Sequence, residues 1–299
     1  MSEKSISVII PAYKAGWCIE NCLDSVEKQS MKPGKVLIGC DACEESFCKV
    51  QEIRDNYDLD IHLYMFPVRS GPYRIRNTLV LLSDSAIVST FDADDIMYGN
   101  HLETMYKTLE DNVYVSPTAW KQEGNSTELR PWPNCHGIVM MYKKDFIKTG
   151  GYEPWICGAD TESLTRWNND GLTKKTLKYP TLLIHKHSGG LTRNKETGLH
   201  SDIRNKYSEE IKRRKKSPVS LDKISVGYFI EEGSTEDLYT DMPEQVIEGG
   251  GDRITVDRAA EILEELSKEI GRTANKNPKL RSAKSRAGRW LKKYKSGEV

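Results

Sequence analysis

Short apolar runs alternate with amphipathic segments along the first 92 residues. The runs at residues 6–13, 34–41, 60–66 and 86–92 predict strands, because each is short, rich in β-branched or aliphatic residues, and ends at a polar residue or a turn. Between them, residues 16–29, 46–57 and 73–84 carry apolar side chains at helical spacing. Strands that alternate with helices predict an α/β fold with a mostly parallel sheet flanked by helices. Ligands bind such sheets beyond the carboxyl ends of the strands.

Polar residues gather at the predicted carboxyl ends. Residues 11–13 close the first run, Asp41 ends the second, and Asp92, Asp94 and Asp95 follow the fourth in the stretch TFDADDIMYG. Carboxylates this close repel one another unless a positive group or water compensates them. A divalent metal holding a diphosphate would supply that charge, and an acid-rich solvated loop is the alternative.

Composition indicates a globular protein with an uneven charge distribution. The 299 residues are 37% hydrophobic and 29% charged, enough for one large domain or two. The formal net charge is zero, yet residues 272–299 hold ten Lys or Arg and one acid, whereas residues 1–271 hold 34 basic and 43 acidic side chains. This basic tail, which includes Trp290 and Tyr294, is typical of segments that bind DNA phosphates or an anionic membrane surface. A solvated tail is the alternative.

The chain shows no transmembrane or targeting segment. No apolar stretch approaches the roughly 18 residues that span a bilayer, and MSEKSISVII lacks the regions of a signal peptide. Seven scattered cysteines, an odd number, suit a reducing compartment. Cys40 and Cys43 with Cys48 suggest zinc, but no second pair or nearby histidine completes four ligands. We therefore expect a cytoplasmic protein.

Six motifs, in order, resemble the nucleotide-sugar glycosyltransferases of family 2, which have the GT-A fold. They are SVIIPAYKAG, GCDACEES, SGPYRIRN, FDADD, GGYEPWICGADTE and HKHSGG. The resemblance predicts a GT-A, Rossmann-like domain at residues 1–195. Residues 196–271 read as a small α+β extension, with a basic helical end at 208–216, a strand at 224–233 and an amphipathic helix at 255–270. The basic tail follows at 272–299.

The resemblance implies a donor-binding end of the site. The residues that it assigns to the nucleotide, ribose and diphosphate of the donor are Pro11, Tyr13, Asp41, Arg76, Asn77 and Asp92. Tyr13 would lie near the base, and Asp41 would accept a hydrogen bond from a base N–H. A planar guanidinium at Arg76 pairs well with phosphate oxygens. Packing and helix-surface roles are the alternatives for these residues.

A metal site is implied beside the donor. By the resemblance, Asp94 coordinates Mg²⁺ or Mn²⁺ that bridges the two phosphates, and Asp95 assists. His187 in HKHSGG is the third contact, with His185 as the other candidate. Such a cation offsets the crowded carboxylates and stabilises charge on the departing nucleoside diphosphate.

Transfer to a hydroxyl also requires a base. The resemblance assigns this role to Asp160, with Glu162 as the second candidate and Trp155 as an apolar wall for a sugar ring. Relatives usually carry Glu-Asp where this chain has Ala159-Asp160, so only the second acid is retained. One base and a direct attack predict inversion at the anomeric carbon.

The donor and acceptor are less sharply predicted. UDP-sugars are favoured by family frequency, and the acceptor hydroxyl is left open between a hydroxymethylated DNA base, a glycan, a lipid carrier and a protein. A nucleotidyltransferase would carry a Gly-rich, Arg-containing loop where this chain has PAYKAG. A noncatalytic nucleic-acid-binding function would account for the basic tail but would not account for the acidic motifs DADD and GADTE.

Overall fold

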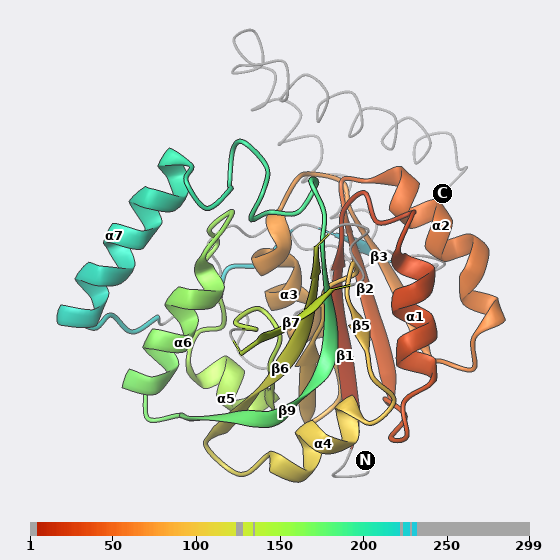
Figure 1. Cartoon of the computed structure of the whole chain (residues 1–299), viewed down its shortest axis with the longest axis horizontal. Coiled ribbons are helices and arrows are strands. Elements are labelled where there is room, and N and C mark those ends of the chain that lie inside the picture. The colour runs from red at the N-terminus through yellow and green to blue at the C-terminus, as the bar shows by residue number, and fades with distance from the viewer. Residues whose placement is uncertain (1–4, 124–127, 134, 222–223, 228, 232–299) are drawn as a thin grey trace, which may run out of the picture.

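The computed structural model describes residues 5–123, 128–133, 135–221, 224–227 and 229–231 (Figure 1). Its strands are β1 (Ile6–Ala12), β2 (Lys35–Asp41), β3 (Ile61–Phe66), β4 (Ile87–Thr90), β5 (Ile96–Met97), β6 (Val113–Glu123), β7 (Leu129–Trp132), β8 (Met140–Tyr142), β9 (Thr173–Lys186) and β10 (Ile230–Glu231). Its helices are α1 (Ile19–Glu27), α2 (Glu44–Ile53), the 3₁₀ turn η1 (Arg54–Asn56), α3 (Gly71–Leu82), α4 (His101–Thr108), α5 (Lys143–Lys148), α6 (Ala159–Asn169) and α7 (Asp202–Lys216).

Within these ranges, ten strands form one sheet in the order β10-β3-β2-β1-β4-β8-β6-β9-β5, with β7 paired to β6. The strands β3, β2, β1 and β4 are parallel, as the alternation of strands and helices predicts. β6 and β9 are also parallel, whereas β5, β7, β8 and β10 pair antiparallel with their neighbours. The α/β prediction is confirmed, and antiparallel strands join the parallel ones both beyond β4 and at the β3 edge.

Helices cover both faces of the parallel strands. Val8 and Ile10 of β1 pack in a cluster with residues of α1 and α4, whereas Ile9 points to a second cluster with residues of α3 and α6. Figure 1 shows α1 and α2 on one side of the sheet, with α3, α5 and α6 on the other. A strand that is buried on both faces has a nearly continuous apolar sequence, which explains the sequence ISVII at residues 6–10.

Close packing sets the position of α3 over β2. A Cβ on Gly39 of β2 would lie 2.5 Å from Ile75 and 2.9 Å from Phe66, so only glycine allows this approach. The first turns of α3 therefore lie at the carboxyl edge of the sheet, beside the ends of β1, β2 and β4.

Two elements of the predicted extension join this body. α7 packs against α6, and β10 pairs with β3. The expected strand at 224–233 contains β10, and the basic helical end at 208–216 belongs to α7. The expected helix at 255–270 and the basic tail at 272–299 lie outside the described residues, and the domain boundaries stay a prediction. In the described part of the chain, no helix has the length and apolar character that a membrane span requires.

Candidate active site

A cleft of about 370 Å³ opens at the carboxyl edge of the parallel strands. It is lined by the β1–α1 loop, the start of α3, the turn after β4, the start of α6 and the end of β9. Most of the residues proposed from the sequence line it, namely Pro11, Tyr13, Asp41, Arg76, Asp92, Asp94, Asp95, Asp160, His185 and His187. Residues as far apart in the chain as Pro11 and His187 therefore meet in one cavity, as the rule for parallel sheets predicts.

Asp41 and Tyr13 form one end of the cleft together with Arg69. The buried carboxylate of Asp41 accepts the backbone N–H groups of Ser70 (2.7 Å) and Gly71 (3.2 Å), and Arg69 Nε lies 2.9 Å from its Oδ2. The guanidinium of Arg69 lies over the ring of Tyr13, 3.5 Å from its centroid. Burial raises the pKa of the Asp41 carboxyl, and Arg69 with the two N–H donors opposes this.

Arg76 and Asp92 form an ion pair at the middle of the cleft. Arg76 is 3% exposed, and its Nη2 donates to Oδ1 of Asp92. Gly137 lies beside the pair, since a Cβ at this position would be 3.5 Å from Arg76 Nη2. Burial raises the pKa of the Asp92 carboxyl and so do the charges of Asp94 and Asp160, while Arg76 lowers it. A charge-assisted bond to a buried guanidinium fixes the orientation of Asp92.

Three carboxylates and a histidine gather where the turn after β4 meets the end of β9. Oxygens of Asp92, Asp94 and Asp95 lie within 4.8 Å of one another, and Nε2 of His187 is 2.8 Å from Oδ2 of Asp94. Asp95 is buried and accepts the backbone N–H of His185 at 3.2 Å. Burial, followed by the charges of Asp94 and Asp92, raises the pKa of Asp95 well above its ordinary value.

This donor set fits a hard divalent cation. Carboxylate oxygens with one imidazole suit Mn²⁺ or Mg²⁺ better than softer metals, which prefer thiolates. A cation would also remove the repulsion that raises the pKa of Asp95. The side chains that could hold it are Asp94, Asp95 and His187, with Asp92 adjacent.

Asp160 lies at the start of α6 and also lines the cleft. Gly158, two positions before it, has a φ of 80°, the left-handed conformation that favours glycine. Oδ1 of Asp160 accepts the hydroxyl of Tyr73 at 3.0 Å. His136 also lines the cleft, and its Nδ1 lies 3.2 Å from Thr161 Oγ1. Burial lowers the pKa of His136, and the charge of Asp160 opposes this.

The match to known families agrees with this geometry. The model of "Glycosyl transferase family 2" matches residues 7–162, more than half of the chain. The chain belongs to glycosyl transferase family 2. This membership confirms the family and the glycosyltransferase domain predicted from the six motifs, and it favours the transferase over the two alternatives.

Curated relatives resemble only part of this family 2 chain. It is 24% identical over 114 residues to the glycosyltransferase GlyG of Streptococcus pneumoniae, which is 37% of this chain and 36% of GlyG. It is 26% identical over 117 residues to an uncharacterized glycosyltransferase of Rickettsia bellii, which is 38% of this chain and 16% of that protein. The chain therefore matches well under half of the length of these relatives.

Solved structures confirm the GT-A fold. The structure of S. aureus TarS 1–349 in complex with UDP-GlcNAc has a TM-score of 0.53 at 14% identity, over 62% of this chain and 60% of that one. The mannosyltransferase PcManGT of Pyrobaculum calidifontis, in complex with GDP-Man and Mn²⁺, has a TM-score of 0.50 at 19% identity, over 60% of this chain and 56% of that one.

Three residues proposed for the transferase site do not line the cleft. Asn77 is fully buried, donates to the carbonyls of Tyr152 (2.8 Å) and Ser225 (2.7 Å), and accepts the N–H of Tyr152 at 2.9 Å. Trp155 stacks on Tyr207 of α7, with ring centroids 4.4 Å apart. These contacts favour structural roles for Asn77 and Trp155.

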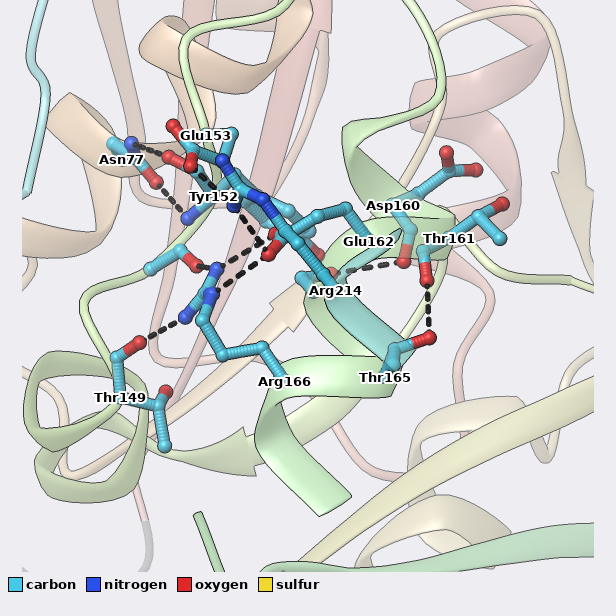
Figure 2. Close-up of polar contacts among 12 residues, drawn as sticks. Asn77, Thr149, Tyr152, Glu153, Asp160, Thr161, Glu162, Thr165, Arg166 and Arg214 are labelled. Atoms are coloured by element: carbon cyan, nitrogen blue, oxygen red, sulfur yellow. Dashed lines mark hydrogen bonds and ion pairs between the residues drawn. The ribbon is translucent and has the colours of Figure 1, made fainter. Parts of the chain in front are cut away.

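Glu162 is the third residue outside the cleft. Its two oxygens lie 3.1 Å from Nε and Nη2 of Arg166, and Oε1 lies 2.9 Å from Nη1 of Arg214. Arg214 also reaches Glu153 at 2.6 Å. Figure 2 shows Glu162 turned toward the two arginines and Asp160 turned away from them. The pairing engages both oxygens of Glu162, so of the two candidate bases only Asp160 has access to the cleft.

The structure adds four residues that sequence reasoning missed. Arg69 directly precedes the SGPYRIRN motif and Tyr73 lies within it, so their position near a helix start was a usable signal. Trp17 lines the cleft, and its ring centroid is 5.0 Å from that of His187. His136 carries no sequence signal, because it lies in an irregular segment between β7 and β8.

Proposed function

We propose that this chain is a metal-dependent, inverting glycosyltransferase that moves a sugar from a nucleotide diphosphate sugar to an acceptor hydroxyl. The observation that carries the proposal is one cavity in which the Asp92–Asp94–Asp95 cluster with His187 and the carboxylate of Asp160 come from separate elements. The first group suits a diphosphate with its cation, and the second suits a general base.

The donor end holds and orients the nucleotide. Tyr13 and Arg69 offer a ring and a guanidinium to the nucleobase. The carboxylate of Asp41 can accept a further hydrogen bond beyond those from its three present donors. Asp92, held by Arg76, is positioned for the ribose. When bound at Asp94, Asp95 and His187, a divalent cation supplies stabilisation of the negative charge that develops on the diphosphate.

The part of the cleft that holds Asp160 activates the acceptor. Asp160 takes the proton of the acceptor hydroxyl while the acceptor oxygen forms a bond to the anomeric carbon. The bond between that carbon and the diphosphate oxygen breaks, and the electron pair leaves with the nucleoside diphosphate. A single displacement of this kind inverts the anomeric configuration, and Glu162 is excluded as a covalent nucleophile because its oxygens are held by Arg166 and Arg214.

UDP-sugars are the favoured donors. TarS in complex with UDP-GlcNAc and PcManGT in complex with GDP-Man support a sugar nucleotide in general, and the family resemblance favours uridine. For the acceptor, the basic tail favours an anionic one, such as a hydroxymethylated base in DNA, over a neutral glycan.

A donor panel with two variants tests the proposal. We would measure nucleoside diphosphate release from UDP-glucose, UDP-GlcNAc and GDP-mannose, with and without Mn²⁺ and with EDTA. Asp94→Ala should abolish metal-dependent donor binding and turnover while circular dichroism stays unchanged. Asp160→Asn should bind donor normally and lose turnover by roughly 10²–10⁴-fold, the usual effect of removing an acid–base group.

The matched control is Asp170→Asn, at the other end of α6 and outside the cleft, which should turn over like the wild type. Undiminished wild-type turnover in EDTA would reject the metal site. Normal turnover of Asp160→Asn would reject the assigned base.

A further inference from the structure

The carboxylate of Asp160 is held by a residue from a distant, rigid part of the fold. Tyr73 lies in the first turn of α3, is 5% exposed, and donates from its hydroxyl to Oδ1 of Asp160 at 3.0 Å. Its ring packs against Tyr152, with centroids 5.6 Å apart, and the guanidinium of Arg76 lies 5.6 Å from the ring. Because the ring is packed on these sides, the position of its hydroxyl is fixed.

The local chain around Asp160 supplies much less support. The two residues before Asp160, Gly158 and Ala159, are buried but carry no side chain that could hydrogen-bond its carboxylate. A short side chain at a helix start, next to alanine and glycine, has several accessible orientations. The hydrogen bond from Tyr73 selects one of them.

We propose that Tyr73 is a positioning residue for the base: its hydroxyl holds Oδ1 of Asp160 and leaves Oδ2 for the acceptor hydroxyl. This inference rests on the proposed function of Asp160. A carboxylate has two oxygens, and the bond with Tyr73 uses only one of them. A base held in one orientation avoids the loss of rate that follows from misplacement at the reacting atoms.

The same helix also fixes the donor end of the cleft. Arg76, one turn after Tyr73 on α3, forms the ion pair with Asp92. One rigid helix thus contacts both the carboxylate beside the donor and the carboxylate of the base. Because α3 is packed closely on β2 at Gly39, the separation of these two carboxylates is set by the core of the fold.

Tyr73 remains a hydrogen-bond donor throughout the working pH range. Burial, followed by the charge of Asp160, raises the pKa of the Tyr73 hydroxyl well above its ordinary value. The hydroxyl therefore keeps its proton at neutral pH and donates it in the hydrogen bond to Oδ1 of Asp160. The other titratable or charged groups that interact electrostatically with Asp160 are Arg76, Asp92, His136, Tyr152 and Cys157.

Tyr73→Phe removes the hydroxyl and keeps the ring. We would measure hydrolysis of UDP-GlcNAc, or of the faster donor of the panel, from pH 3 to 8. The rate should fall by roughly 10-fold with unchanged donor KM, because the base is no longer held in one orientation. The acid limb of the pH–rate profile should move to higher pH, because the hydrogen bond that favours a charged carboxylate is lost.

Tyr114→Phe is the matched control. Tyr114 of β6 is also buried in the core and donates to Asn168 Oδ1 at 3.0 Å, outside the cleft. This variant loses a buried tyrosine hydrogen bond of the same length, so it should leave the hydrolysis rate and the pH–rate profile unchanged.

An unchanged rate in Tyr73→Phe would overturn the inference, and so would a lower rate with an unmoved acid limb. Retained hydrolysis by Asp160→Asn is a separate result: it would reject the proposed function, and the inference that rests on it would be rejected as well.

Discussion

Replacing Glu162 by Gln should destabilise the protein without removing its chemistry. Glu162 and Arg166 are each 2% exposed, and Glu162 bonds both Arg166 (3.1 Å) and Arg214 (2.9 Å). Arg166 also donates to the carbonyls of Thr149 and Gly151, so this cluster ties α6 to the turn after α5 and to α7. Glutamine keeps the shape but leaves the buried guanidinium of Arg166 without its countercharge.

The structure gives the size of the effect. Breaking a fully buried ion pair costs about 3–5 kcal/mol, and we expect the lower value because Gln retains one acceptor oxygen and Arg214 keeps Glu153. At roughly 2–4 °C per kcal/mol for a domain of this size, a loss of about 3 kcal/mol lowers Tm by ~6–12 °C.

Two assays on the same sample separate stability from chemistry. Thermal and urea unfolding at pH 7 measure the loss of stability, and donor hydrolysis at 15 °C, where the variant is still folded, should stay within about twofold of the wild type because Glu162 lies outside the cleft. Glu209→Gln on α7 is the control, since its ion pair with Lys212 is exposed and should contribute under about 1 kcal/mol. An unchanged Tm with lost hydrolysis would refute the reasoning and make Glu162 the base.

Two further predictions concern acid stability and the tail. Burial lowers the pKa of His101 from 6.5 to about 3, so below pH 6.5 the unfolded chain binds a proton that the folded chain does not. Stability should therefore fall by up to ~1.4 kcal/mol per pH unit from this group as pH drops toward 3, and His101→Asn should make the fall shallower in urea unfolding at pH 6 and 5; equal slopes would contradict this. A chain ending at Gly271 should keep donor hydrolysis but lose affinity for hydroxymethylated duplex DNA, and the affinity of the full chain should fall steeply with salt. Anionic vesicles titrated in parallel distinguish a membrane role, and unchanged DNA affinity of the shortened chain would argue against DNA recruitment by the tail.

Local sequence patterns are enough to predict the alternating strands and helices and the sheet edge where a site forms. Strand and helix periodicities are local, so β1 to β4 and α1 to α3 follow from runs of a few residues. The carboxyl ends of parallel strands share one edge, so Asp41 and the carboxylates after β4 had to meet. The six motifs in their order also indicated the glycosyltransferase family, which the match to residues 7–162 confirms.

Which residue of each motif reaches the cleft depends on how the helices pack. Adjacent helical residues point about 100° apart, and residues two apart face nearly opposite directions. Arg76 therefore lines the cleft while Asn77 binds the backbone of Tyr152, and Asp160 lines it while Glu162 faces Arg166 and Arg214.

The partners that decide these directions are distant in the chain. Arg214 lies 52 positions from Glu162, and Tyr73 lies 87 positions from Asp160. No local pattern relates residues so far apart, because their contact depends on how α3, α6 and α7 pack once the sheet has formed. The sequence therefore contained the candidate carboxylates, and the packing of these helices assigned one to the cleft and the other to the core.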